Sequence, residues 1–112
     1  MAREVIWADA AQEDLEASAA YIFHDSPAYA ASFVSRTLKA ARSLISFPLR
    51  GRIVREFGRK DIRQILVFSY RLIYRVEDNR ISILSLIHGA RDFEKAWDER
   101  DREISFKEVH EP

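Results

Sequence analysis

The stretch that best predicts the fold is residues 63–91, RQILVFSYRLIYRVEDNRISILSLIHGAR. This stretch is rich in Ile, Leu, Val, Phe and Tyr, residue types that suit the pleated, half-buried surface of a β-strand. Its clear turn signal is EDNR at residues 77–80. The pattern therefore predicts a β-hairpin at the centre of a sheet.

Side-chain alternation gives each strand of this hairpin two faces. In residues 70–76, YRLIYRV, the apolar face holds Tyr70, Leu72, Tyr74 and Val76, and the reverse holds Arg71, Ile73 and Arg75. In residues 81–88 one face holds Ile81, Ile83, Ser85 and Ile87, and the other holds Ser82, Leu84, Leu86 and His88. We therefore expect a central strand, largely covered on both faces, that stops at Gly89.

Two helices are predicted before this hairpin. Asp9, followed three residues later by Gln, resembles a capping box and starts the first helix, which ends near Asp25. Ser26 as N-cap and Pro27 at the first helical position start the second helix, which a Phe-Pro pair closes. Because the turn between them is so short, the helices should form an antiparallel hairpin whose apolar side is buried against the sheet.

Shorter elements flank the helices and the hairpin. EVIW at residues 4–7 predicts an edge or second strand, residues 53–57 predict another short strand, and a basic loop leads to the strand that begins at Ile62. Residues 92–102 predict a short helix, and residues 104–112 an end that frays or depends on a partner.

The sequence therefore predicts an α+β fold. Its parts are an N-terminal strand, an antiparallel two-helix hairpin packed on a small, mainly antiparallel β-sheet of three to five strands, and a short C-terminal helix. The predicted core is Leu15, Ile22, Phe33, Leu38, Leu44, Leu72, Tyr74 and Ile83.

The length of 112 residues indicates one domain, with room for a single core. The absence of cysteine excludes a disulfide framework and a thiolate site. No apolar run is long enough to span a bilayer and no signal-type segment starts the chain, so the cytoplasm is the expected location.

The net charge of zero hides an uneven distribution. Residues 36–75 carry eleven Lys and Arg but two Asp and Glu, whereas the sequence on either side is acidic. This basic third is either solvated surface or a positive patch that steers an anionic partner, nucleic acid or acidic peptide.

Few residues point to catalysis. The three histidines lack metal-ligand spacing, and no Gly-rich phosphate loop or GxSxG elbow is present, so neither a metal nor a cofactor is expected.

His88, beside Gly89 and Arg91, is a possible functional residue at the rim of the sheet or a structural histidine. Arg63, Arg71, Arg75 and Arg91 could cluster at one end of the sheet to contact phosphates, or each could pair with a carboxylate such as Glu56 or Asp61. Trp97 reads as a cap over the core or as a stacking platform.

Several short motifs occur together in a specific order. They are Ile6-Trp7, Ala11, Asp14-Leu15, Tyr21-Ile22, Ser26-Pro27, Phe33, the FPxxGR residues Phe47, Pro48, Gly51 and Arg52, Arg63, YRLIYRV and the HGAR of residues 88–91. In this order and spacing they resemble the RelE/ParE superfamily of small toxins from bacterial type II toxin–antitoxin systems. The resemblance covers about residues 4–91 and implies a toxin domain at residues 1–91, with residues 92–112 as a helical extension and tail of the same domain.

Two branches of this superfamily differ in function. The branch that resembles RelE cleaves mRNA on the ribosome with two arginines and a C-terminal tyrosine. Here Arg91 fits one arginine, but Leu66 and Trp97 stand where the other arginine and the tyrosine would be. The branch that resembles ParE inhibits DNA gyrase by binding it and uses no known catalytic residue, and FPxxGR with Arg63 matches this branch better.

The resemblance to the ParE branch implies a gyrase-binding toxin that blocks replication and is not an enzyme, as in plasmid stabilization systems. It implies target contacts at Arg63, Arg71, Arg91 and Trp97, and a cognate, ParD-like antitoxin that forms a hetero-oligomer with the toxin and folds along the helical hairpin and the sheet edge. Direct nucleic-acid binding by the toxin alone is not expected. The alternatives are a ribosome-dependent mRNA endonuclease and a non-toxic member that only binds its antitoxin.

Overall fold

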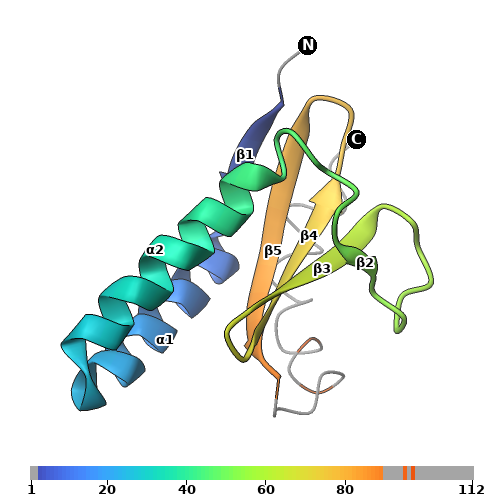
Figure 1. The fold of residues 1–112 in the computed structure, drawn as a ribbon. Coiled ribbons are helices and arrows are strands. Elements are labelled where there is room, and N and C mark those ends of the chain that lie inside the picture. Colours follow the sequence, from blue (N-terminus) through green and yellow to red (C-terminus); the bar gives the residue numbers. More distant parts are fainter. Residues whose placement is uncertain (1–2, 90–94, 96, 98–112) are drawn as a thin grey trace.

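A computed structural model of the chain describes residues 3–89, 95 and 97 (Figure 1). The elements in chain order are β1 (Glu4–Trp7), α1 (Asp9–Asp25), α2 (Pro27–Ser43), β2 (Arg52–Ile53), β3 (Ile62–Val67), β4 (Tyr70–Val76) and β5 (Arg80–His88). The strands form one sheet in the order β1-β5-β4-β3-β2. β1 runs parallel to β5 and the other pairs are antiparallel, so the predicted α+β fold is confirmed. None of the described helices is both long and apolar enough to cross a membrane.

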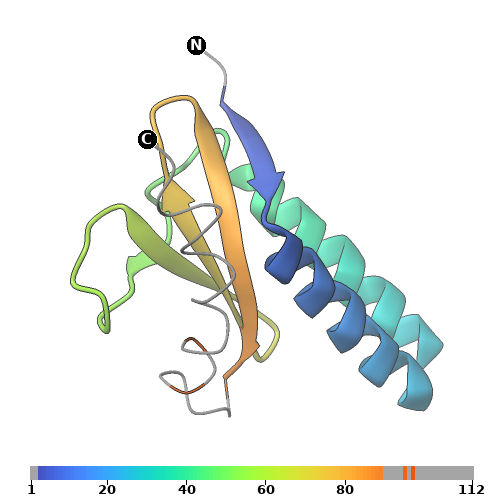
Figure 2. The same cartoon turned by 180° about the vertical axis from the view of Figure 1, so that it is seen from behind.

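The helices form a hairpin on one side of the sheet, which the two opposite views make plain (Figures 1 and 2). Ser26 caps α2 as predicted, because its hydroxyl accepts a 3.1 Å hydrogen bond from the amide of Tyr29. The predicted capping box at Asp9 is wrong, since the N-cap of α1 is Ala8 and no side chain caps it. The Ala8 amide instead donates to the carbonyl of Ile83 at 2.9 Å, so the chain passes directly from the β1–β5 ladder into the helix.

The core between the helices and the sheet is built around Phe33, Leu44, Leu72 and Tyr74, all fully buried. Of the other residues predicted for the core, Ile83 is fully buried, while Leu15 and Ile22 pack against the core from partly buried positions. The prediction for Leu38 is wrong, because its side chain is 36% exposed. The neighbouring Thr37 is buried in its place.

Thr37 fits this apolar position because its hydroxyl donates to the carbonyl of Phe33 one turn earlier, at 2.7 Å. The inward stripe of α2 is therefore Ala30, Phe33, Thr37 and Ala41. Two further apolar residues of α2, Val34 and Leu38, lie on the side of this helix beside α1.

A β-bulge changes the predicted faces of β5. Ile73 is opposite Ser85 and Tyr74 is opposite Ile83, so Leu84 is the extra residue. Beyond the bulge, Leu86 joins Ile83 in the core under the helices, while Leu84 and Ile87 join a second cluster with Ile73. The prediction that Ile87 shares a face with Ile81 and Ile83 is therefore wrong, because strict alternation does not survive an inserted residue.

The carboxylate of Asp14 on α1 completes the edge of β5 beyond the end of β1. One of its oxygens accepts hydrogen bonds from the Leu86 amide and the Ser85 hydroxyl, each at 3.0 Å. Asp14 is itself buried. It takes the place of a strand partner at the point where β1 has turned into helix.

The strand at the β2 edge of the sheet is shorter than predicted. β2 has two residues, Arg52 and Ile53, in place of the strand predicted at residues 53–57. It pairs only with Gln64 and Arg63, so the later part of β3 has no strand beside it on that edge among the described residues. Leu66 stands on this edge, 73% exposed.

Of the predicted C-terminal helix, Lys95 and Trp97 are described, and both are helical. The rest of residues 92–112 lies outside the described residues, as does Arg91.

Candidate functional site

Arg63 and Arg71, both predicted to contact a target, lie on opposite faces of the sheet. Arg63 is opposite Tyr74, whose side chain is in the core under the helices. Arg71 precedes Leu72 of that same core and so points to the other face. The structure therefore does not bring these two arginines together.

Arg63 is held by backbone carbonyls on either side of β2. Its guanidinium donates to the carbonyl of Gly51 at 2.9 Å and to that of Lys60 at 3.0 Å. These bonds tie the residue before β2 and the end of the loop between β2 and β3 to one cation. The assignment of Arg63 to target binding stays a prediction. Its contacts also give Arg63 a structural role, which is to hold the backbone around β2.

The FPxxGR motif is fixed by a second set of contacts around Tyr74. The hydroxyl of Tyr74 accepts a hydrogen bond from the Gly51 amide at 3.0 Å and donates one to the Pro48 carbonyl at 2.8 Å. A Cβ atom on residue 51 would lie 2.6 Å from both this hydroxyl and the Gln64 carbonyl oxygen, so only glycine fits. Burial, the largest effect, raises the pKa of the Tyr74 phenol, although the Gly51 amide and the charges of Arg63 and Arg50 act to lower it. Tyr74 is therefore a neutral hydrogen-bonding group.

Arg71 lies at the base of a polar hollow on the face of the sheet opposite the helices. Six residues line it, and we call it the arginine hollow: Arg52, Ile53, Arg55, Glu56, Gln64 and Arg71, around about 440 Å³. The Arg71 side chain is 17% exposed. Its Nε donates to the Gln64 amide oxygen at 2.5 Å, and its Nη2 lies 3.4 Å from a carboxylate oxygen of Glu56. The Arg71 guanidinium is thus fixed, with Arg52 and Arg55 exposed at the rim.

His88 and Trp97 both meet aromatic rings. The His88 ring lies edge-on to Tyr70, with centroids 5.0 Å apart, on the helix side of the sheet. Trp97 is 7% exposed and lies edge-on to Phe57 at 4.8 Å, in the cluster behind the sheet. Neither lies with Arg63 or in the arginine hollow. Their functional assignments stay predictions, and Trp97 has the burial of a core residue.

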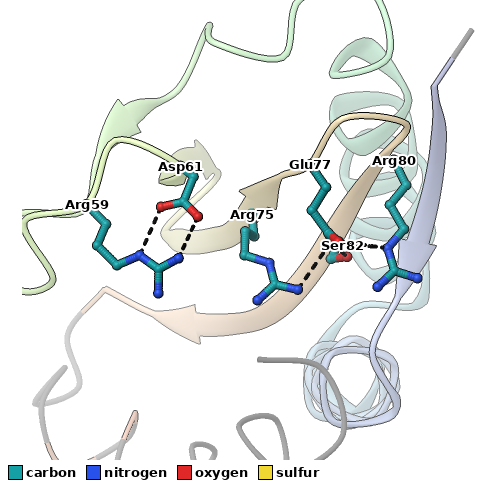
Figure 3. Close-up of polar contacts among 6 residues, drawn as sticks. All are labelled: Arg59, Asp61, Arg75, Glu77, Arg80 and Ser82. Carbon is teal, nitrogen blue, oxygen red and sulfur yellow. Dashed lines mark hydrogen bonds and ion pairs between the residues drawn. The ribbon is translucent and has the colours of Figure 1, made fainter. Parts of the chain in front are cut away.

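Charged side chains also gather at the turn between β4 and β5 (Figure 3). Glu77 accepts hydrogen bonds from Arg80 at 3.1 Å and from the Ser82 hydroxyl, and lies 3.4 Å from Arg75. Desolvation raises the pKa of the Glu77 carboxyl. The hydrogen bonds from Ser82 and Arg80 and the charges of Arg75 and Arg80 outweigh it, so the pKa is lower than usual. In the same view the Arg59 guanidinium forms a bidentate pair with Asp61, at 2.6 and 3.0 Å.

An apolar groove runs between the helices on the side away from the core. It encloses about 820 Å³, and its lining includes Ala19, Phe23, Ala30, Val34, Leu38 and Arg42. Phe23 is 58% exposed. Sequence reasoning assigned Leu38 to the buried core. What could have revealed the groove is that each helix carries more large apolar residues than one inward face can bury.

The chain was compared with known proteins and structures. Residues 5–93 match the family model described as the ParE toxin of the type II toxin–antitoxin system parDE. No curated protein sequence matches the chain.

Two solved structures are similar. One is the chromosomal ParDE toxin–antitoxin system from P. aeruginosa, 21% identical with a TM-score of 0.62, where the match covers 79% of this chain and 96% of that one. The other is the toxin–antitoxin complex RelBE2 from Mycobacterium tuberculosis, 24% identical with a TM-score of 0.53, covering 79% and 99%. At these identities the likeness is one of fold.

Proposed function

We propose, from the premise that this chain belongs to the ParE toxin family of type II toxin–antitoxin systems, that it arrests growth by binding DNA gyrase and blocking replication. A cognate antitoxin would neutralise it, and the pair would stabilise a plasmid that carries its genes. The site of action is then the cytoplasm, where gyrase works.

The observation that carries the choice of a binding inhibitor over an RNA-cleaving enzyme is the composition of the face around Arg71. RNA cleavage needs groups that take up and deliver a proton at the ribose and at the leaving oxygen. Leu66, opposite Arg71 in the sheet, supplies neither. The indole of Trp97 is buried, and the Glu56 carboxylate is paired with Arg71. This face supports recognition of a partner better than acid–base chemistry.

The predicted target contacts take different parts in this proposal. Arg71 is the first candidate, because its guanidinium is fixed in a hollow with two further cations. Arg63 acts as a positioning residue, because it holds both ends of the segment from Gly51 to Lys60, which carries Arg52 and Arg55. Trp97 supports the same loop from below through Phe57.

The antitoxin would occupy the groove between α1 and α2. An amphipathic segment that is disordered alone can lay its apolar side into such a groove and order there. Phe23 and Leu38 offer exposed apolar surface, and Arg42 lines the groove. Arg36 and Lys39 on the exposed side of α2 would meet acidic groups of the antitoxin. The two similar structures contain ParDE and RelBE2 toxin–antitoxin pairs, which supports a partner of this kind.

The test adds the purified protein to a gyrase supercoiling assay and, separately, to ribosomes translating a defined message. We expect inhibition of supercoiling and an intact message. Arg71→Ala should weaken the inhibition, while the matched variant Arg59→Ala, which removes an exposed arginine outside the hollow, should not. Message cleavage with normal supercoiling would refute the proposal, and inactivity in both assays would indicate a member that only binds its antitoxin.

A further inference from the structure

We propose that the arginine hollow is a binding site for carboxylate side chains of an acidic peptide segment in a partner protein. This inference rests on the proposed function, which already places target contact at Arg71, and deepens it by naming the chemistry of the segment that the hollow binds. The hollow lies on the face of the sheet opposite the α1–α2 groove, and hexaglutamate binding can be measured whether or not gyrase is the target. The three arginines have different roles. The Arg71 guanidinium is held in place and anchors the ligand, whereas the side chains of Arg52 and Arg55 can move to contact it.

Charge and coordination indicate an anionic ligand. Three guanidinium groups meet one carboxylate, that of Glu56, among the residues lining the hollow. The side chains of Arg52 and Arg55 make no hydrogen bond or ion pair within the described part of the chain. Holding like charges together without partners is unfavourable, and an oxyanion that bridges them removes that repulsion. The hollow therefore has more positive charge than its own carboxylate neutralises, and an anionic ligand would balance it.

Glu56 indicates which anion fits. Its carboxylate lies 3.4 Å from Arg71 Nη2, so the chain already places a carboxylate against the anchor. Its side chain is one-third exposed and belongs to the turn after β2, from which it can withdraw. An incoming Asp or Glu would replace Glu56 or join it on the rim arginines. Glu56 thus acts as an internal competitor that lowers the affinity of the empty site.

The lining favours a peptide over a nucleic acid. None of the lining residues is aromatic, so no ring is available on which a base could stack. Ile53 and Leu66 are exposed at the hollow and on the strand edge beside it, where they can contact apolar side chains of a peptide.

The experiment titrates the full-length protein with fluorescently labelled hexaglutamate and follows anisotropy at low salt. Arg52→Ala with Arg55→Ala should weaken binding about tenfold to a hundredfold, since hydrogen bonds between charged groups are the strong ones. The matched control, Arg59→Ala with Lys60→Ala, removes the same charge from the adjacent loop and should change binding less than about threefold. Glu56→Gln should tighten binding up to about fivefold.

Two further measurements separate loss of the site from loss of charge or of the fold. Arg52→Lys with Arg55→Lys preserves charge but not the forked geometry, and should recover only part of the affinity. Thermal unfolding of each variant checks that the fold is intact, as expected for exposed positions. Equal losses in the two double-alanine variants, or no hexaglutamate binding at millimolar peptide, would overturn the site. Tighter binding of hexathymidylate, lost with the same two arginines, would overturn the choice of peptide in favour of nucleic acid.

Discussion

The Gly51 amide donates a 3.0 Å hydrogen bond to the hydroxyl of Tyr74, a residue 23 positions later in the chain. The same hydroxyl donates to the carbonyl of Pro48, so one phenol closes the segment after α2 onto the centre of β4. Through this contact the central strand positions β2, and with it one wall of the arginine hollow.

Tyr74→Phe tests this link. The change leaves a buried amide and a carbonyl without their partner, which should cost about 1 to 3 kcal/mol in urea denaturation. Tyr70→Phe is the matched control on the same strand, because the Tyr70 hydroxyl makes no hydrogen bond within the described residues. It should change stability by less than about 0.5 kcal/mol. Equal effects from the two variants would contradict the role given to the Tyr74 hydroxyl.

Asp14→Ala removes the carboxylate that completes the edge of β5. Leu86 and Ser85 would lose a charged acceptor, so we expect a loss of about 2 to 4 kcal/mol in stability. Hydrogen exchange at the Leu86 amide should accelerate more than at other β5 amides. Glu13→Ala, an exposed acid on the same helix, should leave both measurements close to wild type. An unchanged Leu86 exchange rate in Asp14→Ala would rule out this capping role.

Two phenylalanines separate stability from partner binding. Phe33→Ala empties a fully buried position and should cost about 3 to 5 kcal/mol in chemical denaturation. Phe23→Ala, in the exposed groove, should cost less than about 1 kcal/mol. If the groove receives the antitoxin, Phe23→Ala should weaken that complex about tenfold or more, measured with the two purified proteins. A destabilised Phe23→Ala with normal antitoxin binding would reverse these assignments.

Glu77 should make stability depend on acid pH. The pKa of its carboxyl is lowered by folding from an ordinary value of 4.5, so the carboxylate form is favoured in the folded state. Its contribution is therefore complete above about pH 4.5 and is lost as the pH falls through the folded pKa. Denaturation midpoints measured from pH 7 to pH 3 should fall less steeply for Glu77→Gln than for the wild type. Glu13→Gln should keep the wild-type slope, and identical slopes for all three proteins would show that Glu77 does not carry this dependence.

The sequence predicts the fold well where signals are local. Ser26 and Pro27 start α2 through contacts within four residues, and the turn at residues 77–80 carries its own polar signal. The turn between β3 and β4 has no such signal, because Phe68 takes a positive φ of 55° that bulky residues rarely adopt. Its ring packs against Tyr29 and lies under the Arg36 guanidinium. These tertiary contacts override the local preference and are invisible in the sequence.

The candidate site was harder to predict for a geometric reason. Whether Arg63 and Arg71 share a face depends on the register between β3 and β4, which the length of the unsignalled turn sets. Arg52 was assigned to the FPxxGR motif and Arg55 to a short strand at residues 53–57, but no neighbouring strand was assigned to them. They meet Arg71 only because β2 pairs with β3 opposite Gln64, a contact between distant parts of the chain.

The parallel pairing of β1 with β5 has a consequence for synthesis of the protein. Glu4–Trp7 have no partner until Arg80–His88 have been made, which at about 5 to 20 residues per second takes on the order of seconds. The helical hairpin has contacts that are local in sequence and can form sooner. A growing chain therefore presents its helices before its sheet closes. On the function proposed above, the antitoxin would find its groove on a nascent toxin that is not yet able to act.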